Sequence, residues 1–239
     1  AMLKSGYIEV LFKTADTPLG QEFDAAMARY PGLHLAAFAV ADARVQSQRL
    51  ENSGFRVRPI VDLRRAIATE TGEAEVAFTV ARVAPSEMAE GRMQFLTHHS
   101  EAAVWQSRWL DHPNGAEALL DVVIAVENVD EAAARFGRFL GHDPVKTPLG
   151  RGVFLERGGV QLMEAPRFED MFGAISSVPF IGLYALRVAS VAACENVLNA
   201  NGLALKRHKN TLLTIFPKAL GSGAWLFVEA ENDLPWRAL

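Results

Sequence analysis

Residues 119–141 read Leu-Leu-Asp-Val-Val-Ile-Ala-Val-Glu-Asn-Val-Asp-Glu-Ala-Ala-Ala-Arg-Phe-Gly-Arg-Phe-Leu-Gly. The first eight are a β-branched run of strand length. Asn128 follows as a helix N-cap, because its side chain can accept a hydrogen bond from a free amide of the first helical turn. Ala, Arg and Phe alternate at helical spacing over 129–140, and Gly141 ends the helix in a left-handed conformation that suits glycine. The stretch predicts a strand and then a helix.

The same pattern occurs three times, over 33–55, 119–142 and 182–203. In each copy a small polar cap is followed twelve or thirteen residues later by a glycine that opens another strand. Each repeat then ends in a glycine and a short apolar strand. Spacing that regular indicates one βαβββ unit used repeatedly. The caps are Asp42, Asn128 and Ser190, and the later glycines are Gly54, Gly141 and Gly202.

The sequence contains one more closing strand than opening strands among its repeats. Four endings are present, at Gly6, Gly91, Gly158 and Gly223. The first unit is therefore expected to have its last strand at 7–12 but no opening strand or helix. Judged from the later repeats, about 40 residues that would complete it are expected ahead of Ala1.

A βαβββ unit leaves one face of a curved sheet exposed, and a second copy must cover it. The expected fold class is α+β, with repeated βαβββ units paired into two half-barrels and the first unit incomplete at the N-terminus. The half-barrels are expected at 1–115 and 116–239. The second repeat is longer than the others, and its extra residues at 60–73 and 85–90 are read as loops, where binding residues tend to lie.

The composition is typical of a soluble globular protein, with 239 residues, 50% hydrophobic and 22% charged. A net charge of -4 without a basic cluster argues against a nucleic-acid partner. The longest apolar runs fall far short of the roughly 20 residues that cross a bilayer, so no membrane partner is expected. The single cysteine, Cys194, lies on an apolar helix face and is expected to be inert. A single cysteine cannot form a disulfide framework, and this indicates a reducing, cytoplasmic compartment.

The most polar and aromatic neighbourhood is 98–115, which holds three of the six histidines and two of the four tryptophans. Side chains two apart on a strand share a face, so Gln94 and His98 point one way and His99 points the other. The matching residue of the first repeat is Glu9, which has apolar neighbours. A carboxylate in such surroundings is costly to bury unless it is paired or binds a metal.

Each of these residues also has a structural interpretation. Glu9 would equally suit the solvated face of an edge strand. His98 would suit a hydrogen-bonded interior histidine as well as a ligand or an acid-base group. Trp105 and Trp109 either line a pocket or pack the linking helix, and packing is favoured. His112 is read as fixing the turn that follows it.

The repeats and the stretch around the histidines resemble a known family. The repeated βαβββ units, together with Gln94-Phe-Leu-Thr-His-His99, Trp105, Trp109 and His112-Pro-Asn-Gly115, look like the glyoxalase-like domain branch of the vicinal oxygen chelate superfamily. The resemblance implies that paired units hold a divalent metal (Zn, Fe, Mn or Ni) through ligands on the first and last strands of each unit. The metal then chelates a substrate through vicinal oxygens or activates dioxygen.

Carried over residue by residue, the resemblance implies that Glu9 and His98 are metal ligands, with His98 replacing the weaker candidate Gln94. The remaining ligand would lie ahead of Ala1. If the chain is an enzyme, His99 is the candidate acid or base, although its position is also typical of an exposed residue or of one that supports the ligands. Substrate contacts are implied for four residues of the same neighbourhood: Gln94, Trp105, Trp109 and His112.

The second half of the chain departs from the family pattern. Leu183 and Leu226 stand at ligand positions and cannot bind a metal, and Asp121 with Gln161 makes a poor ligand set. That half is expected to be structural or to bind an apolar ligand.

Two functions stay open at this point. The first is a glyoxalase-like, metal-dependent enzyme (a lyase, isomerase or dioxygenase) acting on a small oxygen-chelating molecule. The alternative is a metal-free small-molecule binding or resistance protein on the same fold. Paired units often assemble across subunits in this superfamily, so the resemblance is also compatible with a homodimer.

Overall fold

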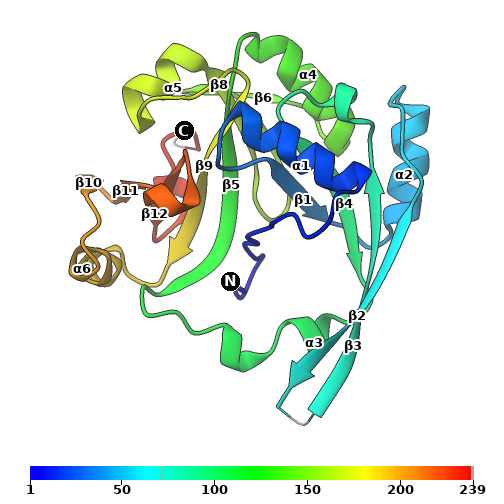
Figure 1. Ribbon diagram of the computed structural model, residues 1–239. Helices are drawn as coiled ribbons and strands as arrows, with labels where there is room; N and C mark the ends of the chain where they lie inside the picture. Colours follow the sequence, from blue (N-terminus) through cyan, green and yellow to red (C-terminus); the bar gives the residue numbers. More distant parts are fainter. Residues whose placement is uncertain (71, 238–239) are drawn as a thin grey trace. The chain divides into compact units, whose positions relative to one another are not determined.

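The computed structural model describes residues 1–70 and 72–237 (Figure 1). Its internal contacts divide the chain into two compact units. The small unit comprises residues 34–110, and the large unit comprises residues 1–33 together with those from 111 onward. Both units combine helices with a mixed sheet, so the protein is of the α+β class. The pairing of repeats into half-barrels at 1–115 and 116–239 stays a prediction.

The small unit contains the second repeat. Its strands form one sheet in the order β1-β4-β3-β2, in which β1 runs parallel to β4 and the other neighbours are antiparallel. Helix α2 packs on β3 and β4. The elements are β1 (Leu35–Ala39), α2 (Ala43–Asn52), β2 (Val61–Thr69), β3 (Gly72–Arg82), β4 (Arg92–His98) and α3 (Glu101–Val104).

Helix α2 begins where the sequence predicts. Asp42 accepts hydrogen bonds from the backbone amides of Arg44 and Val45, at 2.8 and 3.4 Å, as an N-cap should. The hydroxyl of Thr97 on β4 accepts a bond from the Ala43 amide at 2.7 Å. The first turn of α2 is therefore fixed to the sheet.

The extra residues at 60–73 are not a loop, and that expectation is wrong. Their greater part forms β2, which pairs with β3 from Val61↔Val80 to Thr69↔Gly72. The strand went unrecognised because most of its residues are exposed, so its side chains do not alternate between apolar and polar. Conversely, the strand expected to begin after Gly54 is reduced to one bridge between Val57 and Val83.

The large unit contains the third and fourth repeats. Among its described residues, eight strands form one sheet in the order β10-β11-β12-β9-β5-β8-β7-β6. The antiparallel pair β5 and β9 joins the two repeats (Figure 1). The elements are α1 (Pro18–Arg29), β5 (Ala116–Val126), α4 (Val129–Leu140), β6 (Val145–Thr147), β7 (Gly150–Phe154), β8 (Gly159–Glu164), α5 (Ala165–Phe172), β9 (Phe180–Val188), α6 (Val191–Ala200), β10 (Leu205–His208), β11 (Thr211–Ile215) and β12 (Ala224–Val228).

The predicted helix caps of this unit are confirmed. The side chain of Asn128 accepts a bond from the Glu131 amide at 3.0 Å, and Ser190 accepts one from Ala193 at 3.3 Å. Gly141 closes α4 with φ 75°. These local signals explain why α4 has the predicted bounds and why α6 begins directly after its predicted cap.

One face of the large sheet carries the main apolar core. Helix α5, which the sequence analysis did not predict, contributes Phe168 and Phe172 to it, and the end of the chain contributes Leu234 and Trp236. All four side chains are buried. The end of the described chain therefore packs as part of the core.

The strand predicted at 7–12 is absent, and that expectation is wrong. Tyr7 forms one isolated bridge with Met2, and residues 8–12 lie in no strand of the described structure. A strand needs a continuous hydrogen-bonded neighbour, and in this segment of the described structure only Ile8 is paired, through bonds exchanged with Ala1 at 2.9 and 2.7 Å. Its apolar side chains at Val10 and Phe12 are 75% and 79% exposed.

Within residues 1–70 and 72–237, every helix is too short or too polar to cross a bilayer. The cytoplasmic location and the homodimer stay predictions.

Candidate active site

The candidate site lies on the face of the small sheet that α2 covers. Asp62 on β2 pairs in register with Thr79 on β3, and Thr79 pairs with Thr97 on β4. Cross-strand partners share a face of the sheet, so these side chains lie in one row. Arg44, in the first turn of α2, and His99, just after β4, complete the group.

A continuous chain of hydrogen bonds joins these side chains. The Thr79 hydroxyl donates to Asp62 Oδ1 at 2.7 Å, and His99 Nε2 lies 2.7 Å from the Thr79 oxygen. Arg44 donates to Asp62 Oδ2 at 2.5 Å. We call the four residues Arg44, Asp62, Thr79 and His99 the relay.

The relay determines the tautomer of His99. A threonine hydroxyl carries one proton, and here that proton is donated to the carboxylate of Asp62. The Thr79 oxygen can therefore only accept a bond from His99, so Nε2 carries the proton. In the neutral ring, Nδ1 then holds the free lone pair and makes no described hydrogen bond. An imidazole oriented in this way can take a proton at Nδ1 while a carboxylate stabilises the resulting charge through Thr79.

The backbone holds His99 in place. Its amide donates to the Ala77 carbonyl at 3.0 Å, and the hydroxyl of the next residue, Ser100, accepts from the Ala77 amide at 2.9 Å. The His99 side chain is exposed and lines a pocket of about 340 Å³, whereas Thr79 is only 3% exposed. The reactive end of the relay is thus accessible and its middle is buried.

Two ion pairs lie at this pocket. Arg44 and Arg64 line it, Arg44 is paired with Asp62, and Arg64 donates to Glu75 at 2.7 Å. The N-terminus of α2, with its partial positive charge, lies at the same place. The pocket is therefore polar and presents guanidinium donors beside the carboxylate of Asp62.

The pKa of Asp62 is held below its ordinary value, first by the hydrogen bond from Thr79 and then by that from Arg44. A carboxyl group of this kind stabilises the fold above its unfolded pKa, and the contribution is lost as the pH falls through the folded pKa. We expect a ¹³C carboxyl NMR titration of Asp62 to show a midpoint below the value of about 3.9 for a free aspartate. Thr79→Val should raise this midpoint. A wild-type midpoint at or above that value would contradict the hydrogen-bond chain.

His98 lies on the opposite face of the sheet, as strand alternation predicts, because it pairs in register with Phe78 rather than Thr79. Its ring stands between two aromatic rings, with centroid distances of 5.1 Å to Phe78 and 4.8 Å to Trp105. Burial lowers the pKa of His98. The ring is therefore neutral at neutral pH and packs edge-on against aromatic neighbours.

The other predicted substrate residues of the small unit have structural contacts. Gln94 is 8% exposed and accepts a bond from Arg92 Nε at 3.0 Å. Trp105 packs on His98, and Trp109 is half exposed beneath the guanidinium of Arg108. A substrate role for these three residues stays a prediction.

Glu9 and His112 belong to the large unit. Glu9 is exposed and lies within the irregular segment 8–12 that replaces the expected strand. His112 donates from Nε2 to the carbonyl of Met2 at 2.5 Å and so anchors the N-terminal segment. Their roles as metal ligand and substrate contact stay predictions.

The described residues do not fit a divalent metal. Across 1–70 and 72–237, no three side chains of His, Cys, Asp or Glu gather in a way that could hold one. His98 lies between aromatic rings, and the oxygen of Gln94 already accepts a bond from Arg92. We therefore derive no chemical step through a metal.

In the third and fourth repeats, the positions corresponding to the family's ligands are buried in the core. Asp121 accepts bonds from Trp236 Nε1 and from Arg237, and Gln161 donates to the Leu162 carbonyl. Both side chains are 0% exposed. The single cysteine is also buried, and burial raises the pKa of the Cys194 thiol to about 11, so it is not a nucleophile at neutral pH.

Solved structures share this architecture. A hypothetical protein from Staphylococcus aureus superposes with a TM-score of 0.59 at 8% identity, over 89% of this chain and 73% of that one. The Mn(II)-bound glyoxalase from Novosphingobium aromaticivorans superposes with a TM-score of 0.51 at 15% identity, over 82% of this chain and 63% of that one. This chain thus spans less than two thirds of the length of that glyoxalase. At these identities the matches define a glyoxalase-type fold and nothing more.

The sequence specifies the family. The profile of the glyoxalase-like domain matches residues 1–140, which is more than half of the 239. The chain belongs to the glyoxalase-like domain family, and the resemblance inferred from the repeats is confirmed. No curated protein matches the chain in sequence.

Sequence reasoning singled out His99 but missed the other three residues of the relay. Arg44, Asp62 and Thr79 are 20 to 55 positions away from His99 and carry no motif spacing. The register of β2, β3 and β4 and the packing of α2 on the sheet bring them together, and β2 was read as a loop.

Proposed function

We propose that this member of the glyoxalase-like family is a small-molecule enzyme that transfers protons at His99 Nδ1. The observation that carries the proposal is the relay of hydrogen bonds from His99 through Thr79 to Asp62. It fixes the ring, leaves one nitrogen free, and gives a positive imidazolium a carboxylate to balance it. General acid-base catalysis by a positioned histidine accelerates reactions by about 10²- to 10⁴-fold.

The lining of the pocket supports a substrate class. Arg44, Arg64 and the N-terminus of α2 favour a carboxylate or another small oxyanion. Abstraction of a carbon-bound proton is practical at neutral pH only where an adjacent carbonyl group stabilises the resulting charge. The proposed substrates are therefore small 2-oxo acids and related carbonyl carboxylates.

The family and the fold are consistent with proton abstraction from such substrates, but they do not identify the reaction. A structural neighbour is a Mn(II)-bound glyoxalase. A divalent metal in this chain, as in that neighbour, is a separate hypothesis, because the relay needs no metal ligand. The two hypotheses differ in their response to a chelator.

The test is exchange of carbon-bound protons for deuterium. We expect the chain in D₂O to accelerate loss of the methyl proton signal of pyruvate, followed by NMR, over the protein-free rate. Because the relay contains no metal, the acceleration should persist after exhaustive chelation. Loss of the acceleration on chelation, with recovery on adding Mn²⁺, would instead support the metal-dependent enzyme.

The same experiment separates an enzyme from a binding protein. If pyruvate and larger 2-oxo acids shift the His99 ring signals in a saturable way but exchange no protons, the chain is a metal-free binding protein. Neither exchange nor saturable binding across such a panel would overturn the proposal.

A further inference from the structure

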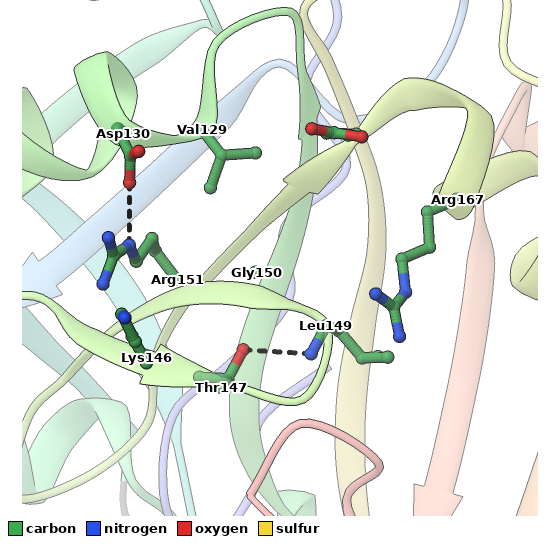
Figure 2. Close-up of a pocket in the computed structure, with 9 residues that line it drawn as sticks. Val129, Asp130, Lys146, Thr147, Leu149, Gly150, Arg151 and Arg167 are labelled. Carbon is green, nitrogen blue, oxygen red and sulfur yellow. Dashed lines mark hydrogen bonds and ion pairs between the residues drawn. The ribbon is translucent and has the colours of Figure 1, made fainter.

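A second pocket lies within the large unit, away from the relay in sequence. It has a volume of about 360 Å³ and is bounded by the first turn of α4, the hairpin of β6 and β7, and the start of α5. Pockets that bind small molecules begin at about 300 Å³. We call it the Lys146 pocket (Figure 2).

Three cationic side chains line the Lys146 pocket. Figure 2 shows Lys146 and Arg151 on one side of Leu149 and Arg167 on the other. Arg151 donates to Asp130 at 2.8 Å. The side chains of Lys146 and Arg167 make no hydrogen bond or ion pair with any described residue, so the charge of both is available to a ligand.

The backbone adds to the positive character of this pocket. Val129 and Asp130, the first two residues of α4, form part of the wall, and amide groups in a first helical turn lack intrahelical acceptors. Asn128 caps only the Glu131 amide. Aligned peptide dipoles place partial positive charge at this end of the helix.

The floor of the pocket is rigid and apolar. Leu149 is 6% exposed, and Gly150 follows it with φ 145°. A side chain at Gly150 would place its Cβ 2.3 Å from the Leu162 carbonyl oxygen. Only glycine lets the hairpin approach β8 this closely, so the floor is fixed by tight backbone packing.

Two carboxylates line the pocket, and one of them restricts the ligand further. Asp130 is paired with Arg151, whereas the exposed Glu164 side chain makes no hydrogen bond or ion pair with the described residues. A bare anion would be repelled by it. A ligand that carries an anionic group for the cations and hydroxyl donors for Glu164 would satisfy both kinds of side chain.

The geometry points to a binding site for a small phosphomonoester that carries hydroxyl groups. A phosphate offers acceptors to three separate donors at once, which suits cations approaching from two sides. The hydroxyl groups would donate to Glu164. This site is independent of the proposed chemistry at His99.

The test uses glycerol 3-phosphate and inorganic phosphate as probes, titrated into ¹⁵N-labelled protein. We expect saturable shifts of the Leu149 and Gly150 amides, with a Kd for glycerol 3-phosphate below roughly 10 mM, which corresponds to about 3 kcal/mol. The double variant Lys146→Gln/Arg167→Gln should weaken binding by about 10-fold, since two exposed charges contribute up to about 1 kcal/mol each. Both residues are exposed, so the variant should fold normally.

A matched variant controls for net charge. Arg157→Gln/Lys206→Gln removes the same charge from exposed positions of the large unit outside the pocket, and should leave the Kd unchanged. Glu164→Gln should tighten inorganic phosphate by removing the repulsion. No saturation by wild type, equal weakening by both double variants, or weaker phosphate binding by Glu164→Gln would each overturn the proposal.

Discussion

Replacing Arg237 with alanine is expected to lower the free energy of unfolding by about 3–5 kcal/mol, the cost of leaving a buried charge without its partner. Asp121 is 0% exposed and receives two bonds from Arg237, at 2.7 and 2.8 Å, and one from Trp236 Nε1 at 2.6 Å. Without the guanidinium, the carboxylate would lie in an apolar core with one hydrogen bond from an indole.

The arginine is held in its charged form by this arrangement. Burial alone would lower the pKa of Arg237, but the hydrogen bond and charge of Asp121, helped by Glu231, raise it above its ordinary value. The guanidinium also lies 4.3 Å from the centre of the Phe154 ring. The end of the described chain is thus tied to the core by charge as well as by the packing of Trp236.

Urea unfolding followed by circular dichroism measures the effect. The control is Arg207→Ala, which removes an arginine bonded to Glu195 in an exposed ion pair of the same unit. That variant should lose no more than about 1 kcal/mol. Asp121→Leu combined with Arg237→Met should recover much of the stability, because no charge is then buried alone. A loss in Arg237→Ala no greater than in the control would contradict this account.

The repeats could be predicted because each begins and ends with local chemistry. Asp42, Asn128 and Ser190 each accept a bond from an amide two or three residues later, and this preference depends on the neighbouring residues alone. Hydrophobic runs such as 119–126 then identify the central strands. The family resemblance followed from these same features.

The parts that could not be predicted depend on contacts between distant residues. Strand β2 is exposed over most of its length and is paired with β3 along its whole length. Asp121 was assessed as a metal ligand because it occupies a ligand position, and nothing near it in sequence indicates Arg237, 116 residues later. The relay could not be predicted for the same reason. Its members are distant in sequence and meet only where α2 packs on the sheet formed by β2, β3 and β4.

Replacing His99 with glutamine is expected to reduce proton exchange by about 10²- to 10⁴-fold, the usual contribution of a general acid-base group. Glutamine keeps a donor that can bond to the Thr79 oxygen but has no basic nitrogen. The matched control is His208→Gln, an exposed histidine of the large unit, which should exchange protons at the wild-type rate. Equal rates in His99→Gln and wild type would remove His99 from the mechanism.

The role of Thr79 distinguishes a relay from a merely well-placed histidine. Thr79→Val keeps the shape of the side chain but breaks both bonds, whereas Thr79→Ser keeps the hydroxyl. Thr79 is buried and acts only through His99, so the valine variant should lower kcat by about 10²-fold with little change in KM, and serine should restore it. Long-range ¹⁵N NMR should show the Nε2-protonated ring in wild type and Thr79→Ser, and a mixture of tautomers in Thr79→Val. If the valine variant keeps both the tautomer and kcat, the hydrogen bond serves only to join β3 to the residue after β4, and the carboxylate of Asp62 takes no part in the chemistry.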